Sequence, residues 1–310
     1  MKKINVVILG TGRVGQTLGY FLQRSRRYQV KALWNRTLKR ARQAAKFIGG
    51  PIEIKNDPVR AARAGEIIFI TTSDGVIKKI CDTVAFHNGF TSSRLVLHCS
   101  GNFSSAILKS ARKLAGVQIG SCHPLQTFAR PSESVKNFSG TYCSYEGTRR
   151  ALPEIKSLIK NLKGIPVKIN PDQKPLYHIA GVIISNYLVT LLEGGQRFLR
   201  RAGFPEKITL PAVKPLVEGT LKNIYTMGIN RALTGPIARG DIVTVKNHLR
   251  LIQRKLPHYL PFYVEMGKMT IRIARRKGTL GISRCNTFKK MFNYEYCFNR
   301  ISLRRKNNGR

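Results

Sequence analysis

Acidic residues are scarce in this sequence of 310 residues. Lysine and arginine number 55, whereas aspartate and glutamate together number only 15, so the formal net charge is +40. A positive charge of this size attracts polyanions such as phosphorylated cofactors, nucleic acid and anionic membranes, or it reflects no more than a generally basic surface. The charge therefore bears on the partners of the protein and not on its fold.

Long apolar runs and paired cysteine motifs are also lacking. No uninterrupted run of about 18 apolar residues occurs, so we expect no segment that spans a membrane. The apolar run near the start is broken by Gly10 and Gly12, and no cleavage site of small residues follows, which favours a cytoplasmic location over secretion. The six cysteines form no C-x-x-C motif and show no metal-ligand spacing, so we predict reduced thiols and no metal site.

Strand-like and helical segments alternate over the first part of the chain. Short runs rich in valine and isoleucine are typical of strands buried on both faces. Such strands occur at 4–9, 28–36, 66–73, 94–101 and 117–128, with helical spacing at 14–25, 37–49, 74–87 and 105–116. This alternation predicts an α/β fold with a doubly wound parallel sheet and right-handed crossovers.

A glycine-rich turn, "GTGRVG", follows the first strand and precedes the first helix. Gly10 permits the tight turn, Gly12 lets the backbone approach a pyrophosphate, and Gly15 lets helix and strand pack closely. The N-terminus of the helix adds free N–H groups and partial positive charge. We therefore predict a Rossmann-type dinucleotide site in which the intervening Thr11, Arg13 and Val14 also take part.

The end of the second strand indicates which dinucleotide is bound. A carboxylate at this point would bind a ribose 2′-hydroxyl and favour NAD, but the sequence reads "WNRT". Asn35, Arg36 and Thr37 offer donors that suit a 2′-phosphate, so we predict NADP as the cofactor. The alternative is that Arg36 is an ordinary surface arginine of a basic protein.

Two further loops lie at the carboxyl ends of predicted parallel strands, where doubly wound sheets bind their ligands. Thr72 and Ser73 follow one strand, and Ser100 follows the next. We predict that these three residues line the nicotinamide and its ribose. Asp74 either joins them or caps the following helix.

The sequence changes character near residue 170. From Pro171 to about Arg276 only long helical segments occur, and the last stretch has no clear period and many basic residues. We predict a nucleotide-binding domain at 1–170, an all-α domain for substrate binding or dimerisation at 171–276, and a basic tail at 277–310 that extends from the core.

Several motifs together resemble a known group of proteins. The motifs are "GTGRVG", "WNRT", "LHCSG", "GSCHPLQTF", "YHIAGVIISNY" and "LTGPIARGDIVTVKNHL". They resemble two-domain Rossmann-like oxidoreductases whose helical second half is a domain of unknown function of the 2520 type. Their relatives are pyrroline-5-carboxylate reductase, ketopantoate reductase and the 6-phosphogluconate dehydrogenase superfamily. The resemblance implies NADP(H) binding, reductase-like activity and a helical domain that often dimerises.

The resemblance also implies catalytic residues on the first helix of the second domain. Related reductases carry a lysine and an asparagine four residues apart there, and here Lys174 and His178 have this spacing on one helical face. His178 replaces the asparagine, so either Lys174 or His178 donates the proton. Asn186 lies two turns further along, on a similar face. The alternatives are an exposed lysine at a helix start and a histidine that belongs to the core.

Three other residues are candidates for substrate binding. His123 and Gln126, in "CHPLQTF", follow a strand at the predicted ligand edge of the sheet, unless His123 serves only in a turn before Pro124. In the helical part, Arg239 either clamps a substrate carboxylate or pairs with Asp241, which then caps the next helix.

These observations favour an NADPH-dependent reductase that transfers hydride to a small carbonyl or imine substrate. A carboxylate-bearing, ketopantoate-like compound fits the basic chain, and the resemblance implies a homodimer. One alternative is an NADP(H)-binding sensor without catalysis. Another is a basic protein that associates with nucleic acid, although no nucleic-acid-binding motif accompanies the charge, so we expect no specific nucleic-acid partner and no membrane partner.

Overall fold

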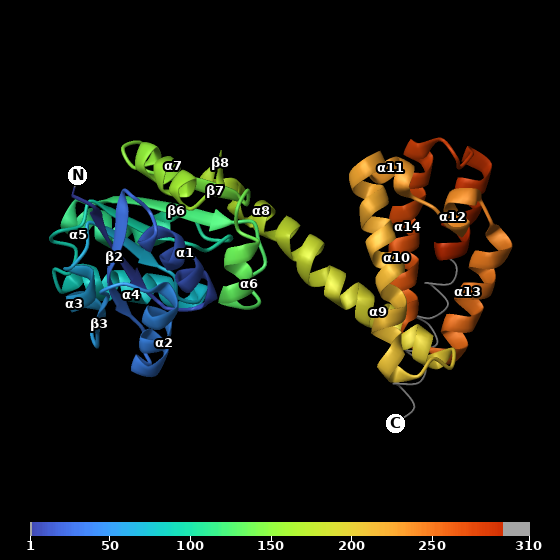
Figure 1. Cartoon of the computed structure of the whole chain (residues 1–310). Helices are drawn as coiled ribbons and strands as arrows, with labels where there is room; N and C mark the ends of the chain where they lie inside the picture. The colour runs from blue at the N-terminus through green and yellow to red at the C-terminus, as the bar shows by residue number, and fades with distance from the viewer. Residues whose placement is uncertain (1, 294–310) are drawn as a thin grey trace, which may run out of the picture. The chain divides into compact units, whose positions relative to one another are not determined.

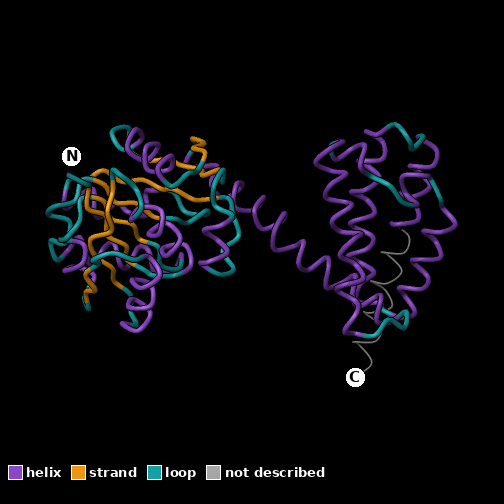
Figure 2. Tube along the Cα trace, in the orientation of Figure 1, coloured by secondary structure: helices purple, strands orange, loops and turns teal. Residues whose placement is uncertain are grey.

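The computed structural model describes residues 2–293, and the described chain divides into two compact units at 188/189. The boundary falls 18 residues after the predicted one at residue 170, inside a long helix and not at a loop. Each unit is described here by itself. In Figure 2 the strands belong to the first unit, and the described part of the second unit contains only helices and loops.

The first unit, coloured blue to green in Figure 1, is built on one sheet. Its eight strands have the order β3-β2-β1-β4-β5-β6-β7-β8. The strands are β1 (Ile4–Leu9), β2 (Tyr28–Trp34), β3 (Glu53–Lys55), β4 (Ile67–Ile70), β5 (Leu95–His98), β6 (Gln118–Pro124), β7 (Tyr142–Gly147) and β8 (Ile165–Lys168). The first six have the order of a doubly wound dinucleotide-binding sheet. The predicted α/β fold with a doubly wound sheet is thus confirmed.

Helices cover both faces of this sheet. They are α1 (Arg13–Gln23), α2 (Leu38–Ile48), α3 (Pro58–Ala62), α4 (Asp74–Phe86), α5 (Lys109–Ala115), α6 (Pro131–Lys136) and α7 (Leu152–Asn161). Side chains of β1 alternate between two cores: Val6 and Ile8 pack with α1, α2 and α7, whereas Val7 and Leu9 pack with α3, α4 and α5. Burial on both faces explains why the strand is an unbroken apolar run.

The sheet departs from the expected parallel arrangement at one point. β7 pairs with β6 in the antiparallel direction, and β8 then returns parallel to β7. The connection from β6 to β7 covers residues 125–141, which is long enough for a crossover, but its only helix is the six-residue α6. A parallel crossover usually contains a full helix. The reversal of direction therefore accompanies the short helix and not a short connection.

In its described residues, 189–293, the second unit contains helices and no strands. After the 3-10 turn Pro171–Gln173, a continuous helical segment runs through α8 (Lys174–Gly181), the π-helical turn η3 (Val182–Asn186) and α9 (Tyr187–Arg201), and it crosses the division between the units. The further helices are α10 (Glu206–Met227), α11 (Ile229–Ala232), α12 (Pro236–Arg239), α13 (Ile242–Lys255) and α14 (Leu260–Lys277). Buried aliphatic side chains such as Val245, Leu249 and Val264 form its core.

The predicted tail at 277–310 is wrong for its first part. Residues 282–293 are helical, and Cys285, Phe288 and Phe292 are buried in the core of the helical unit. These three positions are spaced three and four residues apart, as one face of a helix requires. The remainder of the predicted tail, 294–310, lies outside the described residues.

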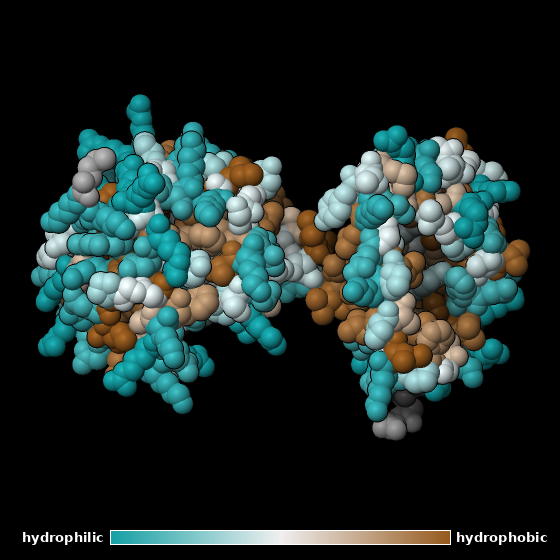
Figure 3. Space-filling view, viewed as in Figure 1, coloured by the Kyte–Doolittle hydropathy of each residue, from teal (hydrophilic) through white to brown (hydrophobic). Residues whose placement is uncertain are grey.

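Exposed apolar side chains are concentrated along the continuous helical segment of α8, η3 and α9 (Figure 3). Ile184, Val189, Leu176 and Tyr187 are each more than 60% exposed. Among the described residues this helix, Pro171–Arg201, is long and apolar enough to cross a membrane by length and composition, and none of its apolar window is buried. Our search for uninterrupted apolar runs missed it because polar residues interrupt the sequence.

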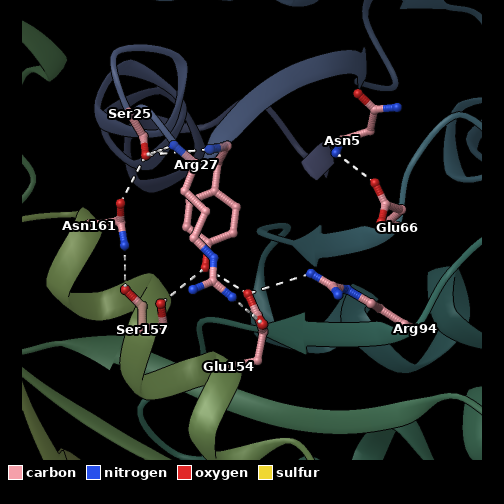
Figure 4. A network of polar contacts seen from close by, with 9 residues as sticks. Asn5, Ser25, Arg27, Glu66, Arg94, Glu154, Ser157 and Asn161 are labelled. Atoms are coloured by element: carbon pink, nitrogen blue, oxygen red, sulfur yellow. Dashed lines mark hydrogen bonds and ion pairs between the residues drawn. The ribbon is translucent and has the colours of Figure 1, made fainter. Parts of the chain in front are cut away.

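A polar network fastens helix α7 to the sheet (Figure 4). The buried Tyr28 on β2 donates its hydroxyl to Glu154 at 2.6 Å, and Arg27 approaches the same carboxylate at 3.0 Å. Burial, followed by the hydrogen bond to Glu154, raises the pKa of Tyr28 to about 12. Because the folded-state pKa is raised, this contribution to stability is complete below pH ~10 and is lost as pH rises toward 12.

Replacing Tyr28 by Phe is expected to lower the free energy of unfolding by about 1.5 kcal/mol, because a buried hydrogen bond to a charged acceptor is lost. Arg94→Gln is the control: Arg94 is half exposed and 3.7 Å from Glu154, so its loss should cost less than about 0.5 kcal/mol. Urea unfolding followed by the fluorescence of Trp34, the only tryptophan, reports on this unit. Equal losses for the two variants would contradict the assigned role of Tyr28.

Candidate active site

The glycine turn between β1 and α1 has the shape that its sequence predicts. Gly10 has φ +107°, and a Cβ atom there would lie 2.7 Å from the backbone nitrogen of Thr72. A Cβ atom at Gly15 would collide with the carbonyl oxygen of Gly10. A Cβ atom at Gly12, in contrast, would lie 4.0 Å from its nearest neighbour, the carbonyl oxygen of Thr71. The first and third glycines are therefore required by packing, whereas the second leaves open space beside the turn.

A cavity of about 650 Å³ lies at this turn and is lined by residues of the first unit. Its lining includes Thr11–Val14, Arg40, Gln43, Thr71–Ser73 and Phe128. The buried hydroxyl of Thr72 has no hydrogen-bond partner among the described residues, although it belongs to this lining. No carboxylate lines the cavity, and Arg13 and Arg40 supply positive charge. The cavity therefore suits an anionic ligand that brings its own acceptors.

The residues expected to select the cofactor lie in different surroundings. Asn35 donates to the hydroxyl of Thr11 at 2.8 Å and accepts from the backbone of Thr37, so its amide holds the loop together. Arg36 is exposed and is not part of the cavity lining, whereas Arg40, one turn into α2, is. Gln43 and Phe128 also belong to the lining, and sequence reasoning missed both.

A second polar cluster lies where β5 and β6 end and α8 begins. Lys174 is fully buried; its ammonium donates to the carbonyl oxygen of Ser100 at 2.9 Å and to the hydroxyl of Ser121. Burial lowers the pKa of Lys174, and the negative charge of Glu146 opposes this shift. The alternative reading of Lys174 as an exposed lysine at a helix start is excluded.

Two histidines in this cluster are held in the neutral form. Burial, together with the charge of Lys174, lowers the pKa of His98 to about 3 and that of His123 to about 4. The hydroxyl of Tyr177 lies 3.0 Å from His123 Nδ1 and donates to the carbonyl oxygen of His123 at 3.2 Å. Both contacts are satisfied when Nδ1 carries the proton, which leaves Nε2 of His123 as an acceptor.

The predicted His178 joins this cluster. Its ring centroid lies 6.4 Å from that of His123, with the ring planes at 87°. A Cβ atom at Gly101 would lie 2.9 Å from His178 Nδ1 and 3.0 Å from His123 Nε2. Gly101 therefore permits the two imidazoles to converge. Neither Gly101, Ser121 nor Tyr177 was predicted, although Ser121 lies two residues before His123 and so shares its face of β6.

Ser100 links this cluster to the neighbouring loop. Its hydroxyl donates to Asp74 at 2.8 Å, and its carbonyl oxygen accepts from Lys174. Asp74 is the first residue of α4, and Ser73 occupies the N-cap position, so of the two alternatives for Asp74 the helix cap is wrong. Behind the cluster the buried Glu146 accepts from the backbone nitrogen and the hydroxyl of Ser105, both at 2.8 Å.

The structure places the remaining predicted residues elsewhere. Gln126 donates to the carbonyl oxygen of Asn137 and accepts from the backbone of Thr127, so its amide is engaged in its own loop. Arg239 belongs to the helical unit, where Asp241 caps α13 by accepting from Thr244 at 3.0 Å. The capping alternative for Asp241 is confirmed. Asn186 is exposed at the end of the π-helical turn, and its catalytic role stays a prediction.

Two family models match the chain. A Rossmann-like domain model matches residues 1–124, and a model described as a domain of unknown function, DUF2520, matches residues 141–270. No curated protein matches the sequence.

Several solved structures share the fold. Protein TM1727 from Thermotoga maritima is 25% identical, with a TM-score of 0.66 over 88% of this chain and 99% of that one. BF3122 from Bacteroides fragilis, for which an NADP oxidoreductase activity has been suggested, is 18% identical, with a TM-score of 0.64 over 87% and 98%. An imine reductase from Pseudomonas sp. is 17% identical, with a TM-score of 0.57 over 96% and 95%. The chain thus carries a Rossmann-like domain at residues 1–124, followed by a segment at residues 141–270 that matches the DUF2520 domain.

Proposed function

We propose that the chain is an NADP(H)-dependent reductase that delivers a hydride to a small carbonyl or imine substrate bearing a carboxylate. The observation that carries the proposal is the buried ammonium group of Lys174, next to the neutral His98 and His123. This cluster lies at the same edge of the sheet as the glycine turn. The solved structures of similar fold include the imine reductase and a pyrroline carboxylate reductase from Plasmodium falciparum with NADP bound.

The cavity at the glycine turn fits a dinucleotide. The open space beside Gly12 and the α1 N-terminus would receive the pyrophosphate, and Thr72 would donate its unpartnered hydroxyl. Arg40, with Arg36 nearby on the loop, would face the additional phosphate of NADP. When bound, the nicotinamide ring supplies the hydride. The protein then has to position the acceptor and provide a proton.

Lys174 suits the second task. An ammonium group has three N–H donors, and Ser100 and Ser121 take two of them. Burial lowers the pKa of Lys174 toward neutral pH, which makes its ammonium group a better proton donor. His178, which is only partly buried, is the member of the pair more accessible to a substrate. We therefore assign the proton and the positive charge to Lys174, and the orientation of the substrate to His178.

The exposed apolar side chains of α8, η3 and α9 support the homodimer as part of this proposal. A row of large apolar side chains on one helix is typical of a protein–protein interface. A second copy of the chain, with the same row, would cover it in a self-complementary contact.

Loss of an arginine at the cofactor cavity is expected to weaken NADPH binding selectively. Arg40→Gln should raise the Kd for NADPH about tenfold, because a charge-assisted contact to the phosphate is lost, and should leave that for NADH nearly unchanged. Arg36→Gln tests whether Arg36 binds this phosphate instead of Arg40. Arg42→Gln, on the same helix as Arg40, is the matched control outside the cavity lining. Fluorescence titration gives the constants. An equal effect of Arg42→Gln would count against a specific phosphate site.

Lys174→Met is expected to lower kcat at least 100-fold, because the proton donor and its charge are lost, while the Kd for NADPH stays the same. His178→Asn, which keeps a hydrogen-bond donor, should lower kcat less than tenfold. The assay follows NADPH oxidation with cyclic imines and 2-keto acids. In the wild type the rate of reduction should fall as pH rises through the pKa of Lys174. Full activity of the Lys174 variant would refute its assignment.

The wild-type chain is expected to be a dimer by light scattering coupled to gel filtration. Ile184→Glu should yield monomers, because a charge then lies in the apolar row, whereas Val243→Glu on α13 should not. Both side chains are 71% exposed, so the two variants differ in location and not in exposure. A monomeric wild type would exclude the proposed dimer.

A further inference from the structure

A second cavity lies entirely within the helical unit. It has a volume of about 620 Å³ and lies where the ends of α9 and α13 meet the start of α14 (Figure 1). Cavities of about 300–1,000 Å³ with mostly apolar walls are the usual size for small organic ligands. None of the residues assigned to the proposed reductase site belongs to its lining.

The walls of this cavity are apolar and held in place by ordered contacts. Phe198, Leu251, Leu256 and Tyr263 are among its apolar and aromatic lining residues. Phe198 packs edge-on against Tyr259 with ring centroids 5.4 Å apart, and the hydroxyl of Tyr263 lies 2.8 Å from His248 Nδ1. The cavity is therefore part of a defined arrangement of three helices.

Two cations at the cavity have no acidic partner among the described residues. Arg201 and Lys255 both line it, and no described carboxylate forms an ion pair with either. The neighbouring arginines on α9 differ: Arg197 pairs with Glu193, and Arg200 pairs with Glu206 at 2.6 Å. Among the described residues, the α9 cation without an ion pair is thus the one that lines the cavity.

None of the described carboxylates of the helical unit pairs with these cations. Its five described acidic residues are Glu193, Glu206, Glu218, Asp241 and Glu265. The four glutamates pair with basic side chains, and the aspartate caps α13. The segment 294–310 has five basic residues and one acidic residue. Its own charge is therefore positive, like that of the two cations at the cavity. Both cations therefore keep their charge available to an anion at the cavity.

Stabilisation of the helix ends is an alternative role for the two cations, but it does not explain their common position at the cavity. Basic residues commonly lie in the last turn of a helix, where they oppose the helix dipole, and Arg201 and Lys255 hold such positions. However, an interaction with the helix dipole requires no cavity, and it does not explain why both cations line the same one. Arg201 and Lys255 instead lie together at one apolar cavity. Such an arrangement suits a ligand with an anionic head group and an apolar body.

We propose that this cavity binds an apolar carboxylate, such as a medium-chain or aromatic carboxylic acid, whose head group pairs with Arg201 and Lys255. The apolar body lies against Phe198, Leu251 and Leu256, and the carboxylate accepts hydrogen bonds from both cations. The site is separate in its residues from the proposed reductase centre and does not depend on reductase activity.

The test uses the full-length protein and two probes, decanoate and the fluorescent apolar sulfonate 1-anilinonaphthalene-8-sulfonate. Decanoate should displace the dye and should bind more weakly as ionic strength rises. The double variant Arg201→Gln/Lys255→Gln should raise the Kd for decanoate at least tenfold. The control Lys207→Gln/Lys246→Gln removes the same charge from exposed positions of the same unit and should leave it unchanged.

Two more variants separate apolar burial from charge. Ala202→Trp should abolish binding by filling the cavity, and Leu251→Ser should weaken it while leaving the core intact, because Leu251 is half exposed. Lys174→Met should bind decanoate like the wild type, which distinguishes this site from the reductase proposal. Equal affinity for decanol, equal loss in the control double variant, or binding only after deletion of 294–310 would each overturn the proposal.

Discussion

The ammonium group of Lys174 holds together three separate parts of the chain. Lys174 is the first residue of α8, and it donates to the carbonyl oxygen of Ser100, beyond β5, and to the hydroxyl of Ser121, on β6. A buried cation without such partners would be very costly, so the helix and the two strand ends have to keep their places. The neutral state of His98 and His123 follows from the same charge and from burial.

The glycine turn shows how packing and ligand binding share a short motif. Gly10 and Gly15 are glycines because the neighbouring backbone leaves no room for a side chain, whereas Gly12 is next to open space. A motif that only stabilised the turn would need the first and third glycines. The second is explained by a ligand that approaches the backbone closely. This separation makes the loop stronger support for a dinucleotide than its spacing alone.

The sequence predicts local features well and contacts between distant segments poorly. The strand of β1, the glycine turn and the helical second part follow from periodicity, and Lys174, His178, His123 and Ser100 do lie together. Ser121 and Tyr177 were missed because their roles arise only when β6 meets α8. The bond from Asn35 to Thr11 could not be predicted because it joins two separate loops, and the predicted contact of Asn35 with the cofactor stays a prediction. The helical residues 282–293 carry a periodic apolar signal, but dense basic residues obscured it.

The scarcity of carboxylates has a consequence for how the chain responds to its solvent. Acid unfolding of most proteins is driven by protonation of paired carboxylates, and this chain has only 15 acidic residues to protonate. Its net charge of +40 instead adds repulsion between cations, which dissolved salt screens over a Debye length of about 8 Å at physiological ionic strength. Counter-ions from the solution thus stabilise this fold by screening its cations. We expect a lower ionic strength to reduce the free energy of unfolding more than a mild change in pH does.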